Sequence, residues 1–246
     1  MAPASGIASA AARIDAATAD PRLFVALDLP TRAEAEAMVE RLGDSVSSYK
    51  IGLELLATEG MALARDLRRR GRFVFADWKL HDIGMTVQRA VAAIAASESC
   101  DVVNVHAEPQ VLAAAVKGRG YSPLKVLGVT VLTSLNGQDL GEIGYAFTPA
   151  QLVERRIRQC IDAGADGVVA SPLEAAVARR IGGPDFLVVT PGVRPTWASL
   201  DDQQRAETPA FALAEGASHI VVGRPITAAA DPRAAALAVV EEMAGV

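Results

Sequence analysis

The residues best suited to chemistry are three charged side chains, Asp77, Lys79 and Asp82, which follow the apolar run Phe73-Val74-Phe75. The run predicts a strand. Because side chains two apart on a strand face the same way, Asp77 and Lys79 should project from one face at its carboxyl end. Charges at the end of a buried strand carry a desolvation cost unless they pair. Carboxylates beside a lysine keep it as an ammonium ion and orient its proton, so this spacing indicates acid-base chemistry.

A purely structural interpretation of the same residues is a salt-bridged strand end in which Asp82 caps the following helix. Aspartate is a good N-cap, although Met85 stands where a capping box would have Glu or Gln. For the Asp-x-Lys pair alone the structural interpretation is favoured. The chemical interpretation depends on other polar residues at equivalent places in the chain.

The elements that must position these charges are short β-branched runs that alternate with longer helical patterns. Strands are predicted at Leu23–Leu27, Ser48–Ile51, Arg72–Phe75, Val102–Val105, Lys125–Leu132, Gly167–Ala170, Phe186–Val189 and His219–Val222. Helices are predicted at Arg32–Leu42, Leu55–Arg70, Thr86–Ser97, Pro109–Lys117, Pro149–Ala163, Leu173–Ile181, Pro209–Glu215 and Pro232–Ala244. Apolar strands followed by amphipathic helices predict a parallel sheet covered on its outer face.

Eight such units in roughly 250 residues predict an α/β protein of the (β/α)8 TIM-barrel type. No Pro/Ser-rich linker divides the pattern, so residues 21–246 are predicted to form a single barrel domain. Residues 1–20 are rich in Ala but have neither a basic n-region nor a Leu/Ile/Val h-region. They are predicted to be a short N-terminal arm with some helix, not a signal peptide.

Polar residues recur at the predicted carboxyl ends of the strands, which form the catalytic face of this barrel. They are Asp28, Lys50, Asp77 and Lys79, Asn104 and His106, Thr133 and Ser134, Pro191-Gly192-Val193-Arg194, and Gly223-Arg224-Pro225. Polar groups at nearly every strand end are hard to explain as stability devices. Lys50 must point into the barrel mouth or extend outward past the helices. If it points inward, it meets Asp77 and Lys79 in an array of alternating charge.

The pair Gly223-Arg224, after the last predicted strand, predicts a phosphate clamp. Glycine lets a backbone N–H approach an anion closely, and the guanidinium adds a charged fork. Arg194 belongs to the preceding loop, and these two loops are the habitual phosphate site of the fold. Phosphate binding is therefore favoured over two unrelated surface charges.

Composition narrows the classes of partner. A net charge of -5 and a pI near 5.3 argue against a nucleic-acid or membrane-surface partner, and no stretch is long and apolar enough to span a bilayer. Cys100 and Cys160 stand alone, which indicates reduced thiols and a cytoplasmic protein. No GxGxxG follows the first strand, and the three histidines are not spaced as metal ligands. We therefore expect no metal and no cofactor.

Taken together and in this order, these pieces resemble the orotidine 5′-monophosphate decarboxylase family over essentially the full chain. The matching segments are Lys50-Ile51-Gly52, Asp77-x-Lys79-x-x-Asp82-Ile83-x-x-Thr86, Val131-Leu132-Thr133-Ser134, Pro191-Gly192-Val193-Arg194 and Asp201-Asp202-Gln203-Gln204-Arg205. The resemblance implies cofactor-independent decarboxylation of orotidine 5′-monophosphate to uridine 5′-monophosphate, a step of pyrimidine biosynthesis. Two positions differ from the usual family pattern, Trp78 and Gly84-Met85, and neither removes a charge.

The resemblance also implies a role for each matching residue. Lys79 is the proton donor to the carbon that loses CO2, and Asp77 lies against the substrate carboxylate. Lys50, Asp77, Lys79 and Asp82 form the charged array. Asp28 and Lys50 hold the ribose, Thr133 or Ser134 the pyrimidine, and Gln203, Gly223 and Arg224 the phosphate, with Arg194 nearby. The resemblance further implies a homodimer in which Asp82, Ile83 and Thr86 reach the neighbouring site.

Two alternatives remain at this point. Sugar-phosphate enzymes of the same superfamily also carry Asp-x-Lys-x-x-Asp, but they use a divalent metal and place an acidic ligand where this chain has Lys50. Lys50 and the Gln203 segment argue against them. A silent phosphate-binding barrel with a regulatory role is the second alternative. Such a protein would need only the phosphate clamp, not the whole set of acids and lysines.

Overall fold

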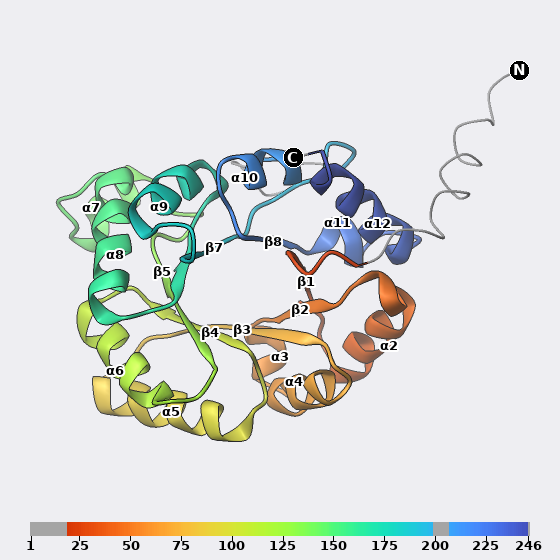
Figure 1. Ribbon diagram of the computed structural model, residues 1–246, viewed down its shortest axis with the longest axis horizontal. Coiled ribbons are helices and arrows are strands. Elements are labelled where there is room, and N and C mark those ends of the chain that lie inside the picture. The colour runs from red at the N-terminus through yellow and green to blue at the C-terminus, as the bar shows by residue number, and fades with distance from the viewer. Residues whose placement is uncertain (1–18, 199–206, 246) are drawn as a thin grey trace, which may run out of the picture.

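The computed structural model describes residues 19–198 and 207–245. Within them, parallel strands close into a barrel in the order β1 to β8, as the sequence predicts. The strands are β1 (Leu23–Ala26), β2 (Ser48–Ile51), β3 (Phe73–Leu80), β4 (Val102–His106), β5 (Lys125–Val129), β6 (Gly167–Val169), β7 (Leu187–Thr190) and β8 (His219–Val222). Figure 1 looks along the barrel and shows the helices as a ring around it.

Helices follow the strands on the outside of the barrel. They are α2 (Arg32–Leu42), α3 (Leu53–Leu56), α4 (Gly60–Arg69), α5 (Gly84–Ser97), α6 (Pro109–Arg119), α7 (Gly137–Ile143), α8 (Pro149–Ala163), α9 (Ala175–Gly182), α10 (Pro209–Ala214), α11 (Arg224–Thr227) and α12 (Pro232–Met243). Short 3₁₀ turns lie at Gly43–Ser45 and Pro172–Glu174. Local sequence fixes where several helices begin. Before α8, the Thr148 side chain accepts a hydrogen bond from the Gln151 N–H, and the Gln151 side chain accepts one from the Thr148 N–H. Pro149 occupies the first helical position.

Two apolar layers hold the barrel together. The inner layer fills the barrel itself and consists of Phe24, Ala26, Phe75, Val102, Leu127, Val129, Val169, Val189 and Val221. Phe24 contacts Phe75 with ring centroids 5.5 Å apart and His219 at 5.3 Å. The outer layer lies between strands and helices and includes Trp78, as strand alternation predicts. Because the inner layer is closed by side chains, a ligand can enter only from an end of the barrel.

The third strand is longer than predicted, and this changes the local geometry of the charges. β3 continues to Leu80, so Asp77 and Lys79 lie within the strand instead of after it. Its register with β4 shifts between Ala76 and Leu80, and Lys79 has a φ of 47°, in the left-handed region. The two side chains share a face, but on a distorted strand, whereas the prediction assumed a regular one.

Other boundaries also differ from the prediction. β5 ends at Val129, so Thr133 and Ser134 belong to the loop beyond it. The single helix predicted over 55–70 is divided into α3 and α4. Helix α5 begins at Gly84 with Ile83 as its N-cap residue, so the interpretation in which Asp82 caps this helix is wrong. Instead, Asp82 Oδ1 accepts a hydrogen bond from the Ile83 N–H at 2.6 Å.

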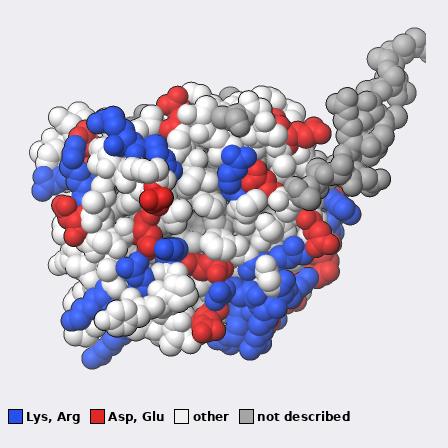
Figure 2. Space-filling model, viewed as in Figure 1, with Lys and Arg blue, Asp and Glu red and all other residues white. Residues whose placement is uncertain are grey.

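Charges of both signs are spread over the face shown in Figure 2, and the largest group of basic side chains lies over α4. Its arginines are paired: Arg68 with Asp101 at 3.0 Å and Arg69 with Asp66 at 3.4 Å. The run Arg68-Arg69-Arg70 lies at the carboxyl end of this helix, with Arg70 as its C-cap residue. Among the helices in the described ranges, none is both long and apolar enough to cross a membrane.

Candidate active site

A cavity of about 460 Å³ opens at the carboxyl end of the strands. Its lining is Ala26, Asp28, Lys50, Gly52, Leu53, Asp77, Lys79, Pro191, Gly192, Val193, Arg194, Val221, Gly223, Arg224, Pro225 and Thr227. These residues come from strands β1, β2, β3 and β8, from the segments that follow β1, β2, β7 and β8, and from the short helices α3 and α11. Most of the predicted site residues therefore meet in one place.

Lys50 points into the barrel mouth, which resolves the choice left open by the sequence. Its side chain is 8% exposed, and Nζ lies 2.9 Å from Asp28 Oδ1 and 3.2 Å from Asp77 Oδ2. Burial alone would lower the pKa of Lys50, but the charges of Asp77 and Asp28 and their hydrogen bonds raise it above its usual value. Lys50 is therefore a permanent cation between two carboxylates.

Asp77 is the centre of the array. Its Oδ1 accepts from Lys79 Nζ at 2.7 Å and from Asn104 Nδ2 at 2.7 Å, while Oδ2 faces Lys50. Burial alone would raise the pKa of Asp77, but the two lysines and these hydrogen bonds lower it. Asp77 is thus an anion held in a fixed orientation.

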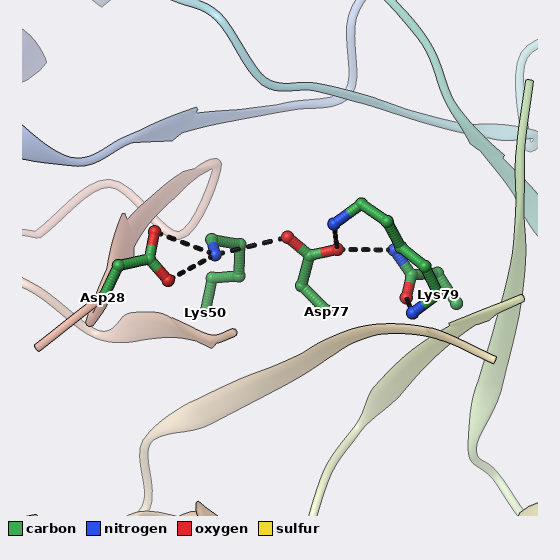
Figure 3. A network of polar contacts seen from close by, with 5 residues as sticks. Asp28, Lys50, Asp77 and Lys79 are labelled. Atoms are coloured by element: carbon green, nitrogen blue, oxygen red, sulfur yellow. Dashed lines mark hydrogen bonds and ion pairs between the residues drawn. The ribbon is translucent and has the colours of Figure 1, made fainter. Parts of the chain in front are cut away.

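Figure 3 shows the resulting line of alternating charge, from Asp28 through Lys50 and Asp77 to Lys79. The Lys79 side chain curves over the Asp77 carboxylate and stays at the cavity surface. The Lys79 side chain is 30% exposed, against 13% for the side chain of Asp77. The arrangement presents a cation and a less exposed anion side by side to whatever occupies the cavity.

A second cavity of about 190 Å³ adjoins the first, since both are lined by Asp77 and Lys79. Its wall is mainly apolar, with Val129, Val131 and Leu132, and its polar edge is formed by Thr133 and Ser134. Flat, partly polar rings suit such a pocket, because apolar walls cover the ring faces and hydroxyls meet its edge.

The opposite side of the large cavity is basic. Arg194 is 7% exposed, and Arg224 opens the short helix α11 directly after Gly223. Two guanidinium groups on loops after β7 and β8 provide the donors that a phosphate group needs. Arg194, Gly223 and Arg224, which the sequence predicts to form a phosphate clamp, therefore line the same cavity. Gln203, the remaining residue predicted there, lies outside the described residues.

Of the predicted site residues that the structure describes, three line neither cavity. Asp82, Ile83 and Thr86 lie on the rim, at the start of α5, and all three are exposed. Ile83 is 76% exposed. Among the described residues, Asp82 forms no ion pair with Lys50 or Lys79, so the array within one chain has three of its four expected members.

No role was assigned from the sequence to two residues that belong to the site. Asn104 was noted only as a polar strand end, although its side chain joins Asp77 and Lys79. Gly52 was quoted only as part of a motif. A Cβ atom there would lie 2.3 Å from Asp28 Oδ1 and 3.2 Å from Lys50 Nζ, so the missing side chain makes room for that ion pair. The spacing Lys-x-Gly is the signal that could have indicated it.

The histidines do not join the array. His219 lies against Phe24 and Ser218, and burial lowers its pKa to about 4. The His106 ring lies 5.0 Å from the His81 ring between centroids, and burial, His81 and Arg156 lower the pKa of His106. Among the described residues, no three His, Cys, Asp or Glu side chains are grouped as metal ligands would be.

The chain is similar to known proteins over most of its length. The family model described as "Orotidine 5'-phosphate decarboxylase / HUMPS family" matches residues 21–239. The orotidine 5′-phosphate decarboxylase of Caulobacter sp. (strain K31) is 67% identical over 228 residues, covering 93% of this chain and 99% of that protein. The enzyme of the same name from Rhodopseudomonas palustris (strain BisB5) is 53% identical over 232 residues, with 93% and 98% covered.

A solved structure extends the likeness to three dimensions. The crystal structure of orotidine 5′-phosphate decarboxylase from Lactobacillus acidophilus superposes with a TM-score of 0.79 at 36% identity, covering 91% of this chain and 99% of that one. Family model, close relatives and fold therefore agree over almost the whole chain. The chain belongs to the orotidine 5′-phosphate decarboxylase / HUMPS family.

Proposed function

We propose that this protein decarboxylates orotidine 5′-monophosphate to uridine 5′-monophosphate, a carbon-carbon lyase reaction of pyrimidine biosynthesis. One observation carries the proposal: the line Lys50–Asp77–Lys79 faces a cavity whose far side holds Arg194 and Arg224. A nucleotide monophosphate spans such a cavity, with its phosphate at the arginines and its base at the charges.

Each part of the substrate has a matching partner. The phosphate binds Arg194, Arg224 and the Gly223 backbone, with Gln203 completing the clamp. Asp28 and Lys50 bind the ribose hydroxyls, and the pyrimidine enters the pocket edged by Thr133 and Ser134. The substrate carboxylate then lies against Asp77, beside Lys79.

The chemistry follows from that placement. The C6–carboxylate bond breaks, CO2 leaves, and the electron pair remains on C6. Lys79 stabilises this charge as an ammonium ion and then donates its proton to C6, while Asp77 holds the ammonium group in position at 2.7 Å. Repulsion between Asp77 and the substrate carboxylate is relieved as CO2 departs, and binding energy at the phosphate offsets the cost of that contact.

We further propose that the active unit is a two-fold dimer in which Asp82, Ile83 and Thr86 complete the neighbouring site. The support is their position: all three are exposed on the rim, and Ile83 and Met85 place apolar surface there at 76% and 54% exposure. Exposed apolar residues beside an incomplete charged array favour a second copy as the occupant. A cytoplasmic location is proposed from the free thiols of Cys100 and Cys160, both buried.

The test is a direct assay of purified protein with orotidine 5′-monophosphate in excess EDTA, following loss of substrate absorbance. Turnover that persists under chelation is expected, because the proposed reaction uses only side chains. Turnover that disappears with EDTA and returns with a divalent metal would point instead to the sugar-phosphate branch of the family. No turnover with or without metal would favour a non-catalytic phosphate-binding protein.

A further inference from the structure

Strand β3 is distorted at the point where it carries the catalytic charges. Ala76 pairs with Val103 and Leu80 pairs with Val105, so three residues of β3 lie opposite the single residue Asn104. Within this bulge Lys79 has a φ of 47°, a conformation that residues other than Gly, Asn and Asp rarely adopt. Something must hold the backbone there, because ordinary ladder bonds are interrupted.

The side chain of Asn104 occupies the gap. Its Oδ1 accepts a hydrogen bond from the Lys79 backbone N–H at 2.7 Å, and its Nδ2 donates to Asp77 Oδ1 at 2.7 Å. The residue is 0% exposed. A backbone N–H can only donate and a carboxylate can only accept, so these two neighbours dictate which end of the amide is oxygen.

Two consequences bear on the reaction. The bond to the Lys79 N–H replaces a ladder bond and holds Lys79 in the left-handed conformation from which Nζ reaches Asp77. The bond to Asp77 Oδ1 fixes the rotation of the carboxylate, so that Oδ2 stays turned toward Lys50 at 3.2 Å. One buried amide therefore couples the proton donor to the anion beside it.

We propose that Asn104 is a positioning residue that sets the Lys79 backbone and the Asp77 carboxylate for proton transfer. The inference rests on the proposed function for its kinetic part. In the described part of the chain, Asn104 forms hydrogen bonds with Lys79 and Asp77, whereas the proposed phosphate and ribose partners there lie on other strands and loops. Loss of Asn104 should therefore act on the chemical step and leave nucleotide binding largely intact.

Two variants distinguish the roles of the hydrogen bonds that Asn104 forms with Lys79 and with Asp77. Asn104→Ala removes both, and we expect kcat to fall by about 10²-fold, as for a misplacement of about 1 Å, with KM and UMP binding changed less than about threefold. Asn104→Asp keeps the acceptor for Lys79 but puts a second carboxylate beside Asp77. Its kcat should be low at neutral pH and recover as the pH falls, because a protonated carboxyl group both accepts and donates.

Thr130→Val is the matched control. Thr130 is also 0% exposed, follows the neighbouring strand β5, and its hydroxyl donates to the Val169 carbonyl. This variant loses a buried hydrogen bond away from the charges, so its melting temperature should fall while kcat is unchanged. A kcat loss as large as that of Asn104→Ala would mean that any buried polar deletion has this effect.

A crystal structure of Asn104→Ala gives a readout independent of activity. We expect Lys79 to leave the left-handed region and its Nζ to move away from Asp77. Wild-type geometry there, or wild-type kcat in a folded variant, would overturn the inference. If Asn104→Ala does not fold, the pH profile of kcat for Asn104→Asp tests the positioning role instead. A profile parallel to that of the wild type would overturn that role. Absence of decarboxylation in the wild-type protein would instead contradict the proposed function, and the structural readout would still stand.

Discussion

The Asp28 carboxylate occupies the space where a side chain of residue 52 would begin: a Cβ atom added at Gly52 would lie 2.3 Å from Asp28 Oδ1. The backbone of Gly52 has a φ of -88°, so the glycine is not needed for a left-handed conformation. It is needed because the carboxylate that pairs with Lys50 occupies the space where a side chain would begin. The glycine of the Lys50-Ile51-Gly52 segment is thus required for a steric reason that only the folded site reveals.

Gly52→Ala should therefore displace the Asp28 carboxylate and weaken nucleotide binding. A charge-assisted hydrogen bond of about 1.5–3 kcal/mol is at stake, so UMP affinity measured by calorimetry should fall by about tenfold or more. Gly141→Ala is the control, since a Cβ atom on Gly141 in α7 meets nothing within 4 Å. Unchanged UMP affinity in Gly52→Ala would remove Asp28 from the binding site.

Lys79→Ala and Arg224→Ala should fail in different ways. Removing the proton donor acts on the chemical step, so Lys79→Ala should lower kcat by at least about 10³-fold while UMP still binds. Arg224→Ala should mainly raise KM, by about 10²-fold, because a charged partner of the phosphate is lost, and added phosphite should partly compensate. Near-normal turnover in Lys79→Ala would contradict the proposed mechanism.

Mixing two inactive proteins tests whether the site is shared between subunits. A dimer of one Lys79→Ala chain and one Asp82→Ala chain would contain one site with both defects and one with neither. After subunit exchange at equal concentrations, activity should return to about a quarter of the wild-type value, because half of the dimers are mixed and half of their sites are intact.

Exchange must be demonstrated independently in that experiment, for example with differently tagged chains. If exchange occurs and no activity returns, Asp82 acts within its own chain. Full monomeric behaviour at the assay concentration would also contradict the dimer proposal. The control is a mixture of Lys79→Ala with Asp77→Ala, which never yields an intact site, because both residues belong to the same chain's array.

Stability should depend on pH through His219. Burial lowers its folded-state pKa to about 4, whereas the unfolded chain titrates near 6.5. As the pH falls, the unfolded state takes up a proton on His219 at a higher pH than the folded state does. The contribution of His219 to the free energy of unfolding is therefore fully present above about pH 6.5 and is lost as the pH drops toward 4. His219→Gln should reduce that fall by on the order of 2 kcal/mol in urea unfolding measured across this range.

Ser218→Ala provides the comparison for that measurement. The Ser218 hydroxyl contacts His219 and also bonds to the backbone of Val188, so its loss should lower stability by a similar amount at each pH. His219 remains, and with it the slope between pH 6.5 and 4. An unchanged slope in His219→Gln would assign the acid sensitivity to other groups.

The barrel and the ends of its strands could be predicted from the sequence, because local periodicity encodes both. Apolar runs and helical patterns place Asp28, Lys50 and Arg224 at the carboxyl ends of strands whatever the details of packing. Strand alternation also placed Trp78 in the outer layer. These predictions needed only the side-chain period of each element and the rule that parallel strands end on one face.

Only the tertiary structure decided the bulge in β3, the left-handed conformation of Lys79 and the place of Asn104. Closing the barrel fixes the register between β3 and β4, and the mismatch of residues there is a property of the pair, not of either strand. The inward direction of Lys50 and the space left by Gly52 were likewise set by neighbours distant in sequence. Local sequence specifies which residues reach the mouth of the barrel, while contacts between strands specify how those residues face one another.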